Sequence, residues 1–554
     1  MANNEQPSHI VAIDIGTTSA KALVFALDGG ETIGKVSAAE TAVRTIARAE
    51  REYPLHVPKP GWAEQDPRLI TLMAEEAVSE AISAAKLSAD DLLAISFSTA
   101  MHSLIMVDKS GEPLTKSITW ADTRAEGFAQ RLREREDTAE LHLRTGVPIH
   151  AMTPLCKLMW LHDNDPQSIA EASYMIGIKE YILNRWCGAD PSSGAAYVMD
   201  EAVAGGTGLY NVHSRDWDDE ALALAGIGRE LLPELAPTTR YFPGLLPEIA
   251  LKLGIAANVP VVIGGADGVL ANFGSGAVLP GIVEVTVGTS GAVRVAVNQP
   301  SAGDVGKLFC YPLAEQLWIA GGAVNSGGVV FRWLRDQLLP DVKLEAARDG
   351  EDAYKRLLEM ASSVPPGAGS LLFLPHLTGE RAPHYDERAR GVWFGLSLEH
   401  ERQHMLRAGL EGILFGLRSV LEGVSAAAGR PQEIRVSGGF TKPVAIRQLM
   451  ADMFGCPVKI SSTGDASAAG AAKLALFALG LAPTLAPAYI APPPSLDSDS
   501  AEEYLAGEVC YPNKANAAVY DALYPQFRRI YEALKPSFSE LAAYREQSSV
   551  VAKS

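Results

Sequence analysis

Cysteines are few in this chain, and none lies in a pattern typical of a metal site or of a disulfide framework. The 554 residues include five, namely Cys156, Cys187, Cys310, Cys456 and Cys510. No Cys-x-x-Cys pair occurs, and no pair of histidines lies near any of them. The spacing favours neither a zinc site nor a disulfide-stabilised fold, so we expect reduced, mostly packed thiols.

Long basic runs and long apolar runs are also missing. No stretch is rich in Lys and Arg, and the formal net charge is −18. Because a nucleic-acid-binding protein carries a basic patch, we expect no nucleic-acid partner. The polar segment Met1–His9 holds no signal sequence, and no uninterrupted apolar stretch reaches membrane-spanning length. We therefore expect a cytoplasmic protein without a membrane partner.

The commoner phosphate-binding loops are absent as well, but a Gly-Thr turn between two strands occurs twice. There is no GxxxxGK[ST] loop, and no GxGxxG follows a predicted strand. The two predicted hairpins consist of Ile10–Ile15, Gly16–Ser19 and Ala22–Leu27, and of Ile282–Val287, Gly288–Gly291 and Ala292–Val297. Superposition places Asp14 on Thr286, Gly16 on Gly288 and Thr17 on Thr289. One repeat at such a separation indicates two related halves.

The backbone N–H groups and hydroxyls of such turns suit phosphate oxygens. Asp14 precedes the first turn and can hold Mg²⁺ through water, because this ion keeps most of its hydration shell. For one copy, an ordinary hairpin tip with a solvated Asp is an equally good interpretation. Two copies favour a nucleotide held between two domains, each of which offers one hairpin.

Alternating strand-like and helical patterns predict α/β layers in both halves. The length predicts two to four domains, and we place limits at 8–275, 276–482 and 483–554. The last part holds a Pro-rich connector, 483–494, and an apolar stripe that begins at Tyr520 and predicts an amphipathic helix docked on the body. The remaining predicted strands are Leu93–Phe97, Pro260–Ile263, Leu371–Leu374 and Glu433–Val436, and the predicted helices are Leu69–Ala85, Pro154–His162, His400–Ala428 and Ala466–Leu479.

Asp267 follows the apolar strand Val261–Ile263 within a Gly-Gly-Ala-Asp-Gly sequence. A carboxylate at this point can accept the proton of a hydroxyl that attacks a phosphoryl group. Taken alone, an Asp between glycines is more often a turn residue.

Two polar segments follow apolar runs and mix aromatic, cationic and hydroxyl groups, namely Ser98–Ser103 and Trp120–Arg124. Such mixtures suit a polyhydroxylated ligand. The alternatives are a core histidine at His102 and a surface ion pair between Asp122 and Arg124. The glycines of Ser437–Phe440, with 464–472 further on, can lie against a flat adenine, although close packing of small residues explains them equally well.

Together these segments resemble the FGGY family of carbohydrate kinases. The resemblance covers the chain from Ile10 to about Leu481 and implies an α/β fold of two RNase H-like (actin/hexokinase-type) domains flanking an ATP cleft. It also implies ATP and Mg²⁺ as cofactors. The runs that carry it are Gly61–Pro67, Met152–Asn164, Leu377–Pro383 and Gly391–Leu396.

The resemblance assigns roles to the candidate residues and favours the functional interpretations of Asp14 and Asp267. Asp267 matches the catalytic base, and Asp14 forms the first phosphate loop together with Thr17 and Thr18. The phosphate and adenine positions are Gly16, Thr17, Thr18, Gly288, Thr289, Ser290, Gly438 and Gly439. The acceptor positions are Met101, His102, Trp120 and Asp267, with Asp122 and Arg124 adjacent.

Within the family, four segments are most similar to bacterial gluconokinases, namely Ser98–Leu104, Ile118–Arg124, Ala266–Leu270 and Gly321–Gly328. This implies phosphorylation of gluconate to 6-phosphogluconate, with His102 and Arg124 as candidate partners of the substrate carboxylate. The alternatives are a kinase for xylulose, another ketose or polyol, or glycerol, and a non-catalytic ATP-binding switch of the actin fold. A homodimer is compatible with the sequence.

Some positions depart from the family pattern. Asp465 stands where the family usually has Glu, and Gly409 replaces a small non-Gly residue. Ala202 and Gly205 occupy positions at which gluconokinases tend to carry Ser. The last pair lies in a substrate-domain segment and bears on the sugar preference.

Overall fold

The computed structural model describes residues 8–27, 35–279, 281–301, 306–461, 465–486 and 509–551, with side chains described as far as residue 545. The chain folds into two compact units. The described residues of the first unit come from Met1–Pro280, Ala296–Ala320 and Asp465–Ala491. Those of the second unit come from Gly281–Val295, Gly321–Gly464 and Pro492–Ser554.

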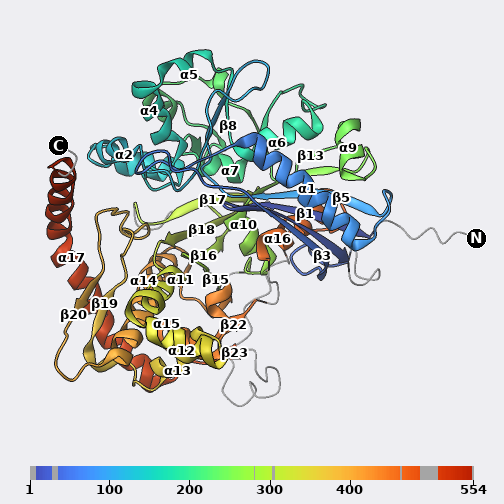
Figure 1. Ribbon diagram of the computed structural model, residues 1–554. Coiled ribbons are helices and arrows are strands. Elements are labelled where there is room, and N and C mark those ends of the chain that lie inside the picture. The colour runs from blue at the N-terminus through green and yellow to red at the C-terminus, as the bar shows by residue number, and fades with distance from the viewer. Residues whose placement is uncertain are drawn as a thin grey trace, which may run out of the picture. The chain divides into compact units, whose positions relative to one another are not determined.

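The first unit is built around a six-stranded mixed sheet (Figure 1). The sheet order is β13-β14-β5-β1-β2-β3. Strand β1 pairs antiparallel with β2 and parallel with β5. This order agrees with the RNase H-like fold that the resemblance implies. The strands are β1 (His9–Ile15), β2 (Ser19–Leu27), β3 (Val43–Glu52), β5 (Leu92–Thr99), β13 (Tyr241–Phe242) and β14 (Val261–Ala266).

Strand β1 is apolar at almost every position because both of its faces are covered. Val11, Ile13 and Ile15 belong to one buried cluster together with residues of α1 (Pro67–Ala85). Residues at the intervening positions belong to a second cluster on the opposite face, with α16 (Ala466–Ala478). Asp14 has the same parity as this second set, so its side chain lies on the α16 face.

Helices α10 (Asp267–Gly274) and α16 pack closely through glycines. A Cβ at Gly274 would overlap the Ala466 carbonyl oxygen, and one at Gly470 would overlap the Leu270 carbonyl oxygen. Small residues therefore let the two backbones touch. This contact positions α10, whose first residue is Asp267.

The other elements of the first unit are short strand pairs and helices around this sheet. The strands are β4 (Glu64–Gln65), β6 (Ile105–Val107), β7 (Ser117–Ile118), β8 (Tyr174–Ile176), β9 (Val198–Asp200), β10 (Tyr210–Asn211), β11 (Asp216–Trp217) and β12 (Glu234–Ala236). Strand β17 (Phe309–Ala314) falls within the residues of the first unit but belongs to the seven-stranded sheet that also contains β15 (Ile282–Val287). The helices are α2 (Glu126–Arg133), α3 (Thr138–Thr145), α4 (Pro154–Asn164), α5 (Pro166–Glu171), α6 (Ile178–Cys187), α7 (Glu201–Gly205), α8 (Asp219–Ala225) and α9 (Pro247–Leu253).

The second unit repeats the central motif of the first. Its strand β15 pairs antiparallel with β16 and parallel with β21, as β1 does with β2 and β5. Strand β22 is parallel to β21 and antiparallel to β23. The chain passes from one unit to the other within β16 and β18. The bounds are β15 (Ile282–Val287), β16 (Gly291–Val297), β18 (Leu317–Val324), β19 (Leu372–Leu374), β20 (Val392–Phe394), β21 (Glu433–Ser437), β22 (Val458–Ile460) and β23 (Val509–Cys510).

The C-terminal helix α17 (Lys514–Val551) docks on the second unit, as the apolar stripe predicts. Tyr520, Tyr524 and Phe527 are buried and contact the ring of Phe415. The Pro-rich connector lies outside the described residues from 487 onward. The other helices of this unit are α11 (Gly328–Trp333), α12 (Pro340–Asp349), α13 (Ala353–Ser362), α14 (Arg402–Ala428) and α15 (Val444–Phe454).

The predicted α/β class is confirmed, and each predicted strand and helix outside the connector is present within a few residues of its expected limits. The domain limits at 275 and 482 stay a prediction. None of the described helices is both long and apolar enough to cross a membrane.

Candidate active site

The first Gly-Thr turn is fixed by hydrogen bonds to its carbonyl groups. Tyr53 Oη donates to the Gly16 carbonyl at 2.6 Å, and Gln65 Nε2 donates to the Thr17 carbonyl at 2.6 Å. In a trans peptide the C=O and N–H groups point in opposite directions. The N–H groups of Thr17 and Thr18 therefore point away from Tyr53 and Gln65, and the turn can offer both to an anion.

Asp14 lies at the end of β1, beside the turn. Ser98 Oγ of the neighbouring strand donates to its Oδ1 at 2.7 Å. Burial raises the pKa of Asp14, and hydrogen bonds from Ser98 and Ser467 partly oppose this rise. A partly buried carboxylate is stabilised in its ionised form by a nearby cation, so Asp14 fits a magnesium ion held through water. Among the described residues, no group of three or more His, Cys, Asp or Glu forms a metal site, so protein ligands to such an ion would be few.

Asp267 lies at the same edge of the sheet. In the parallel pairing, Ser98 is opposite both Asp14 and Gly265, so the carboxyl ends of β1, β5 and β14 meet at one edge. The register of β14 shifts between Val262 and Gly265, which is a β-bulge that redirects the chain toward Asp267. Its Oδ1 accepts a hydrogen bond from Gly268 N at 2.6 Å.

Met101 and His102 follow β5 and contact the segment after α7. His102 has a positive φ of 67°, and its Nδ1 lies 2.7 Å from the Gly206 carbonyl oxygen. A Cβ at Gly206 would overlap the Met101 side chain. The neighbouring Gly205 faces Pro312, whose Cδ would lie 2.9 Å from an added Cβ. Pro312 therefore occupies the space that a serine at position 205 would need.

Lys157 holds the backbone of two segments that carry or adjoin the predicted acceptor residues His102 and Trp120. Its fully buried Nζ donates to the carbonyls of His102 at 2.5 Å and Ile118 at 3.1 Å. Burial lowers the pKa of Lys157 to about 7, against the opposing attraction of Asp122. A neutral amine keeps two N–H donors, which matches the two carbonyl acceptors. Lys157 thus stabilises the unusual backbone conformation at His102.

We expect Lys157→Met to raise the KM for the acceptor roughly tenfold, because His102 loses its carbonyl anchor and each unsatisfied buried carbonyl costs ~1–3 kcal/mol. Stability should also respond to pH. Between pH 7 and about 10 the unfolded lysine is protonated while the folded one is neutral, so wild-type stability rises with pH by up to ~1.4 kcal/mol per unit. Melting curves at pH 7 and pH 9 measure this gain, which the variant should lack.

Lys473→Met provides the control, because Lys473 is also a mostly buried lysine, and its Nζ donates to the carbonyls of Ala39 and Gly274. It should lower the melting temperature and leave the acceptor KM unchanged. An acceptor KM equal to the wild-type value in Lys157→Met would refute the anchoring role.

Trp120 contacts the first Gly-Thr turn, since its Nε1 donates to Thr17 Oγ1 at 2.7 Å. Asp122 and Arg124 form a buried ion pair, not a surface pair. The Arg124 guanidinium also pairs with Glu64 at 2.6 Å and lies 3.7 Å from the centre of the Trp62 ring. Two carboxylates balance its charge within the protein, and its role toward a substrate carboxylate stays a prediction.

The second unit builds an equivalent edge around Thr286, which lies opposite Ser437 as Asp14 lies opposite Ser98. Gly288 N donates to the Ser290 carbonyl, two residues on, at 2.9 Å, whereas Gly16 N donates to the Ser19 carbonyl, three residues on, at 3.0 Å. The superposition made from the sequence therefore agrees with the strand pairing of β1 and β15, but the second turn is one residue shorter than the first.

Glycines from two other segments, Gly328 and Gly438, lie against the backbone at this second turn. Gly328 N donates to the Gly288 carbonyl at 2.8 Å, and a Cβ at Gly438 would overlap the Val287 carbonyl oxygen. Gly438 has a φ of 93°, which favours glycine. By contrast, nothing lies within 4 Å of a Cβ built at Gly288 or Gly439. Close packing thus accounts for Gly438, while Gly288 and Gly439 leave space beside the backbone.

Sequence reasoning did not assign roles to four residues that support the first turn and the acceptor segments, namely Tyr53, Glu64, Gln65 and Lys157. Glu64, Gln65 and Lys157 lie in the family-like runs Gly61–Pro67 and Met152–Asn164, so the resemblance to the family could have pointed to them. Tyr53 lies outside these runs, and no sequence pattern pointed to it. The metal, phosphate, adenine, base and acceptor roles of the predicted residues stay predictions.

Two family models match the chain. The model of the N-terminal domain of the FGGY family of carbohydrate kinases matches residues 9–274, and that of the C-terminal domain matches residues 283–479. A gluconokinase of Bacillus subtilis (strain 168) is 37% identical over 97% of this chain and 98% of its own. A xylulose kinase of the same organism is 26% identical over 97% of this chain and 99% of its own.

Solved structures give a similar result. A gluconate kinase and a ligand-bound xylulose kinase, both from Lactobacillus acidophilus, each match with a TM-score of 0.84 and 34% identity. Each match covers 96% of this chain and 99% of the other. The structural likeness alone does not separate these two substrates.

Proposed function

Because this chain belongs to the FGGY family of carbohydrate kinases, we propose that it transfers the γ-phosphate of ATP to a hydroxyl of gluconate. The products are 6-phosphogluconate, ADP and a proton. The observation that supports gluconate most is the greater identity to the gluconokinase of Bacillus subtilis than to the xylulose kinase of that organism.

In the proposed reaction, Asp267 accepts the proton of the attacking hydroxyl as the bond to phosphorus forms and the bond to the leaving ADP oxygen breaks. Its place at the end of β14 and the start of α10 supports this role, because the carboxylate is attached to two packed elements. Met101, His102 and Trp120 bind and orient the acceptor.

The ATP phosphates are proposed to bind the N–H and hydroxyl groups of Gly16–Thr18 in the first unit and of Gly288–Ser290 in the second. Gly439, which has open space beside its backbone, and Gly438 are proposed to contact adenine. Asp14 would hold Mg²⁺ through water, and the bound ion would neutralise charge on the phosphates. The carboxylate of Asp14, held by Ser98, is chemically suited to this ion.

A panel of acceptors tests the proposal. We expect ADP release by the purified chain to have its highest kcat/KM with gluconate, at least about tenfold above that with xylulose, ribulose or glycerol. A reaction without acceptor measures background ATP hydrolysis, which should be low. A preference for xylulose would move the assignment within the family.

The second candidate of a different class is a non-catalytic ATP-binding switch. No ADP release with any acceptor, together with measurable ATP binding, would support this candidate. The joint presence of Asp267, the Met101-His102 pair and Trp120 beside the first turn favours the kinase, because a switch needs no acceptor-binding groups.

A further inference from the structure

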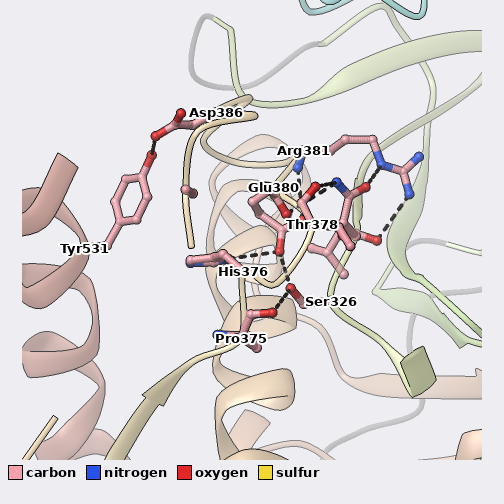
Figure 2. Close-up of polar contacts among 12 residues, drawn as sticks. Ser326, Pro375, His376, Thr378, Glu380, Arg381, Asp386 and Tyr531 are labelled. Carbon is pink, nitrogen blue, oxygen red and sulfur yellow. Dashed lines mark hydrogen bonds and ion pairs between the residues drawn. The ribbon is translucent and has the colours of Figure 1, made fainter. Parts of the chain in front are cut away.

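Glu380 is a buried carboxylate in the loop between β19 and β20 of the second unit (Figure 2). Only 2% of the residue is exposed. Its Oε1 accepts hydrogen bonds from the backbone N–H of Arg381 at 3.0 Å and of Asn325. Its Oε2 lies 2.6 Å from Ser326 Oγ and 3.2 Å from His376 Nδ1. Four donors thus converge on one side chain that no part of the proposed mechanism uses.

Two of these donors lie in the segment Asn325–Gly328, which joins β18 to α11. Arg381 also holds this segment, because its Nε donates to Asn325 Oδ1 at 2.8 Å and its guanidinium donates to the Val324 carbonyl at 3.2 Å. Burial raises the pKa of Glu380, but the contacts with His376 and Ser326 outweigh burial and lower it. The carboxylate therefore stays ionised, which strengthens its hydrogen bonds.

The other end of the same segment supports the second Gly-Thr turn. Gly328 N donates to the Gly288 carbonyl at 2.8 Å, and Val329 N donates to the Thr289 carbonyl at 3.0 Å. A Cβ at Gly327 would lie only 2.6 Å from the Ser290 carbonyl carbon, so the two backbones are in direct contact. Any displacement of Asn325–Gly328 must therefore move the turn.

The C-terminal helix holds the Glu380 loop from its other side. Tyr531 of α17 is 1% exposed, and its hydroxyl donates to Asp386 Oδ2 at 3.0 Å (Figure 2). The Tyr531 ring stacks on His384 with 3.6 Å between ring centroids. The backbones of Asp386 and Glu380 exchange two hydrogen bonds, at 2.8 and 2.9 Å. These contacts connect α17 to Glu380 through Asp386.

We propose that Glu380 is a positioning residue that holds Asn325–Gly328 in place and thereby fixes the Gly288–Ser290 turn for the ATP phosphates, with Tyr531 of the C-terminal helix supporting the Glu380 loop. This inference rests on the proposed role of that turn. The loop belongs to the family-like run Leu377–Pro383, to which the sequence assigned no chemical role.

The test compares Glu380→Gln with a matched control, Glu411→Gln. A glutamine at 380 presents one NH₂ group toward donors that need an acceptor, so the segment must shift. We expect the KM for ATP to rise at least tenfold, with the acceptor KM unchanged. Glu411 is also buried in the second unit, at 1% exposure, where it accepts from Gly367 N, Arg407 and the Tyr520 hydroxyl, none of which lies in Asn325–Gly328 or in the turn. Its variant should lower the melting temperature but leave the ATP KM unchanged.

A second measurement is independent of turnover. Hydrogen exchange in peptides that cover Gly288–Ser290 and Asn325–Val329 should become faster in Glu380→Gln and stay unchanged in Glu411→Gln. Tyr531→Phe should shift exchange and ATP KM in the same direction by a smaller amount, with Tyr524→Phe as its control because the Tyr524 hydroxyl contacts Ser419 instead.

The outcomes separate the two proposals. Unchanged exchange and ATP affinity in Glu380→Gln, with gluconate phosphorylation intact in the wild type, would overturn the positioning role alone. If the exchange changes as expected but ATP dissociation measured by calorimetry does not, the turn does not bind phosphate and the inference fails. If Glu380→Gln lowers ATP affinity as expected but the wild type phosphorylates no acceptor, the kinase proposal fails while the positioning role stands.

Discussion

Replacement of Asp267 by alanine is expected to lower kcat by about 10²–10⁴-fold while ATP binding survives, because this is the usual contribution of a general base. The carboxylate lies at the junction of β14 and α10, and alanine is compatible with the first turn of a helix. The fold should therefore persist. Initial rates at saturating ATP and gluconate measure the loss, and calorimetry measures the affinity for ATP.

The matched control is Asp219→Ala. Asp219 is also the first residue of a helix in the first unit, α8, but its side chain is largely exposed and pairs with Arg229. This variant should keep wild-type kcat. Turnover of Asp267→Ala near the wild-type level would remove the assignment of the base. A loss of ATP affinity equal to the loss of kcat would point to a structural role instead.

Strands β1 and β15, which precede the two Gly-Thr turns, could be predicted from the sequence because their apolar runs are short and end in glycines. β1 and β15 were both predicted within one residue of their observed ends, and the alignment of Asp14 with Thr286 agrees with their cross-strand partners Ser98 and Ser437. Local periodicity and turn chemistry are sufficient for such elements.

Contacts that join distant parts of the chain could not be predicted in this way. Lys157 reaches the His102 carbonyl across 55 positions, and Ser326 reaches Glu380 across 54. Lys157 is charged and Ser326 is polar, and hydropathy would place both side chains at the surface, yet both are buried. Only the tertiary structure shows that each satisfies backbone or hydroxyl groups beside a candidate site.

The bulge that precedes Asp267 is a further feature that local pattern did not reveal. The apolar run Val261–Ile263 predicts a strand, but not that β14 gains one residue relative to β5 between Val262 and Gly265. Gly264 adopts a φ of 68° within this bulge. Without the extra residue, Asp267 would lie at a different register with respect to Ser98 and Asp14.

Substitution of Gly264 by alanine is therefore expected to destabilise the first unit strongly. A Cβ at this position would overlap the Phe97 carbonyl oxygen of β5, and backbone cannot move aside as a flexible side chain can. The positive φ adds strain of its own. Together we expect a loss of at least ~4 kcal/mol, which lies in the exceptional range for single substitutions. Thermal denaturation should show a fall of roughly 10 °C in the transition of the first unit.

Gly416→Ala in helix α14 makes the same chemical change with the opposite expectation. Nothing lies within 4 Å of a Cβ at Gly416, and a helix interior favours alanine over glycine by ~0.5–1 kcal/mol. It should leave the melting temperature unchanged or raise it slightly. If Gly264→Ala melts like the wild type, β14 does not need this bulge. If it melts early but the protein still folded at 20 °C keeps wild-type kcat, the bulge stabilises the sheet without positioning Asp267. A joint loss of stability and kcat is the result expected if one strand irregularity serves both.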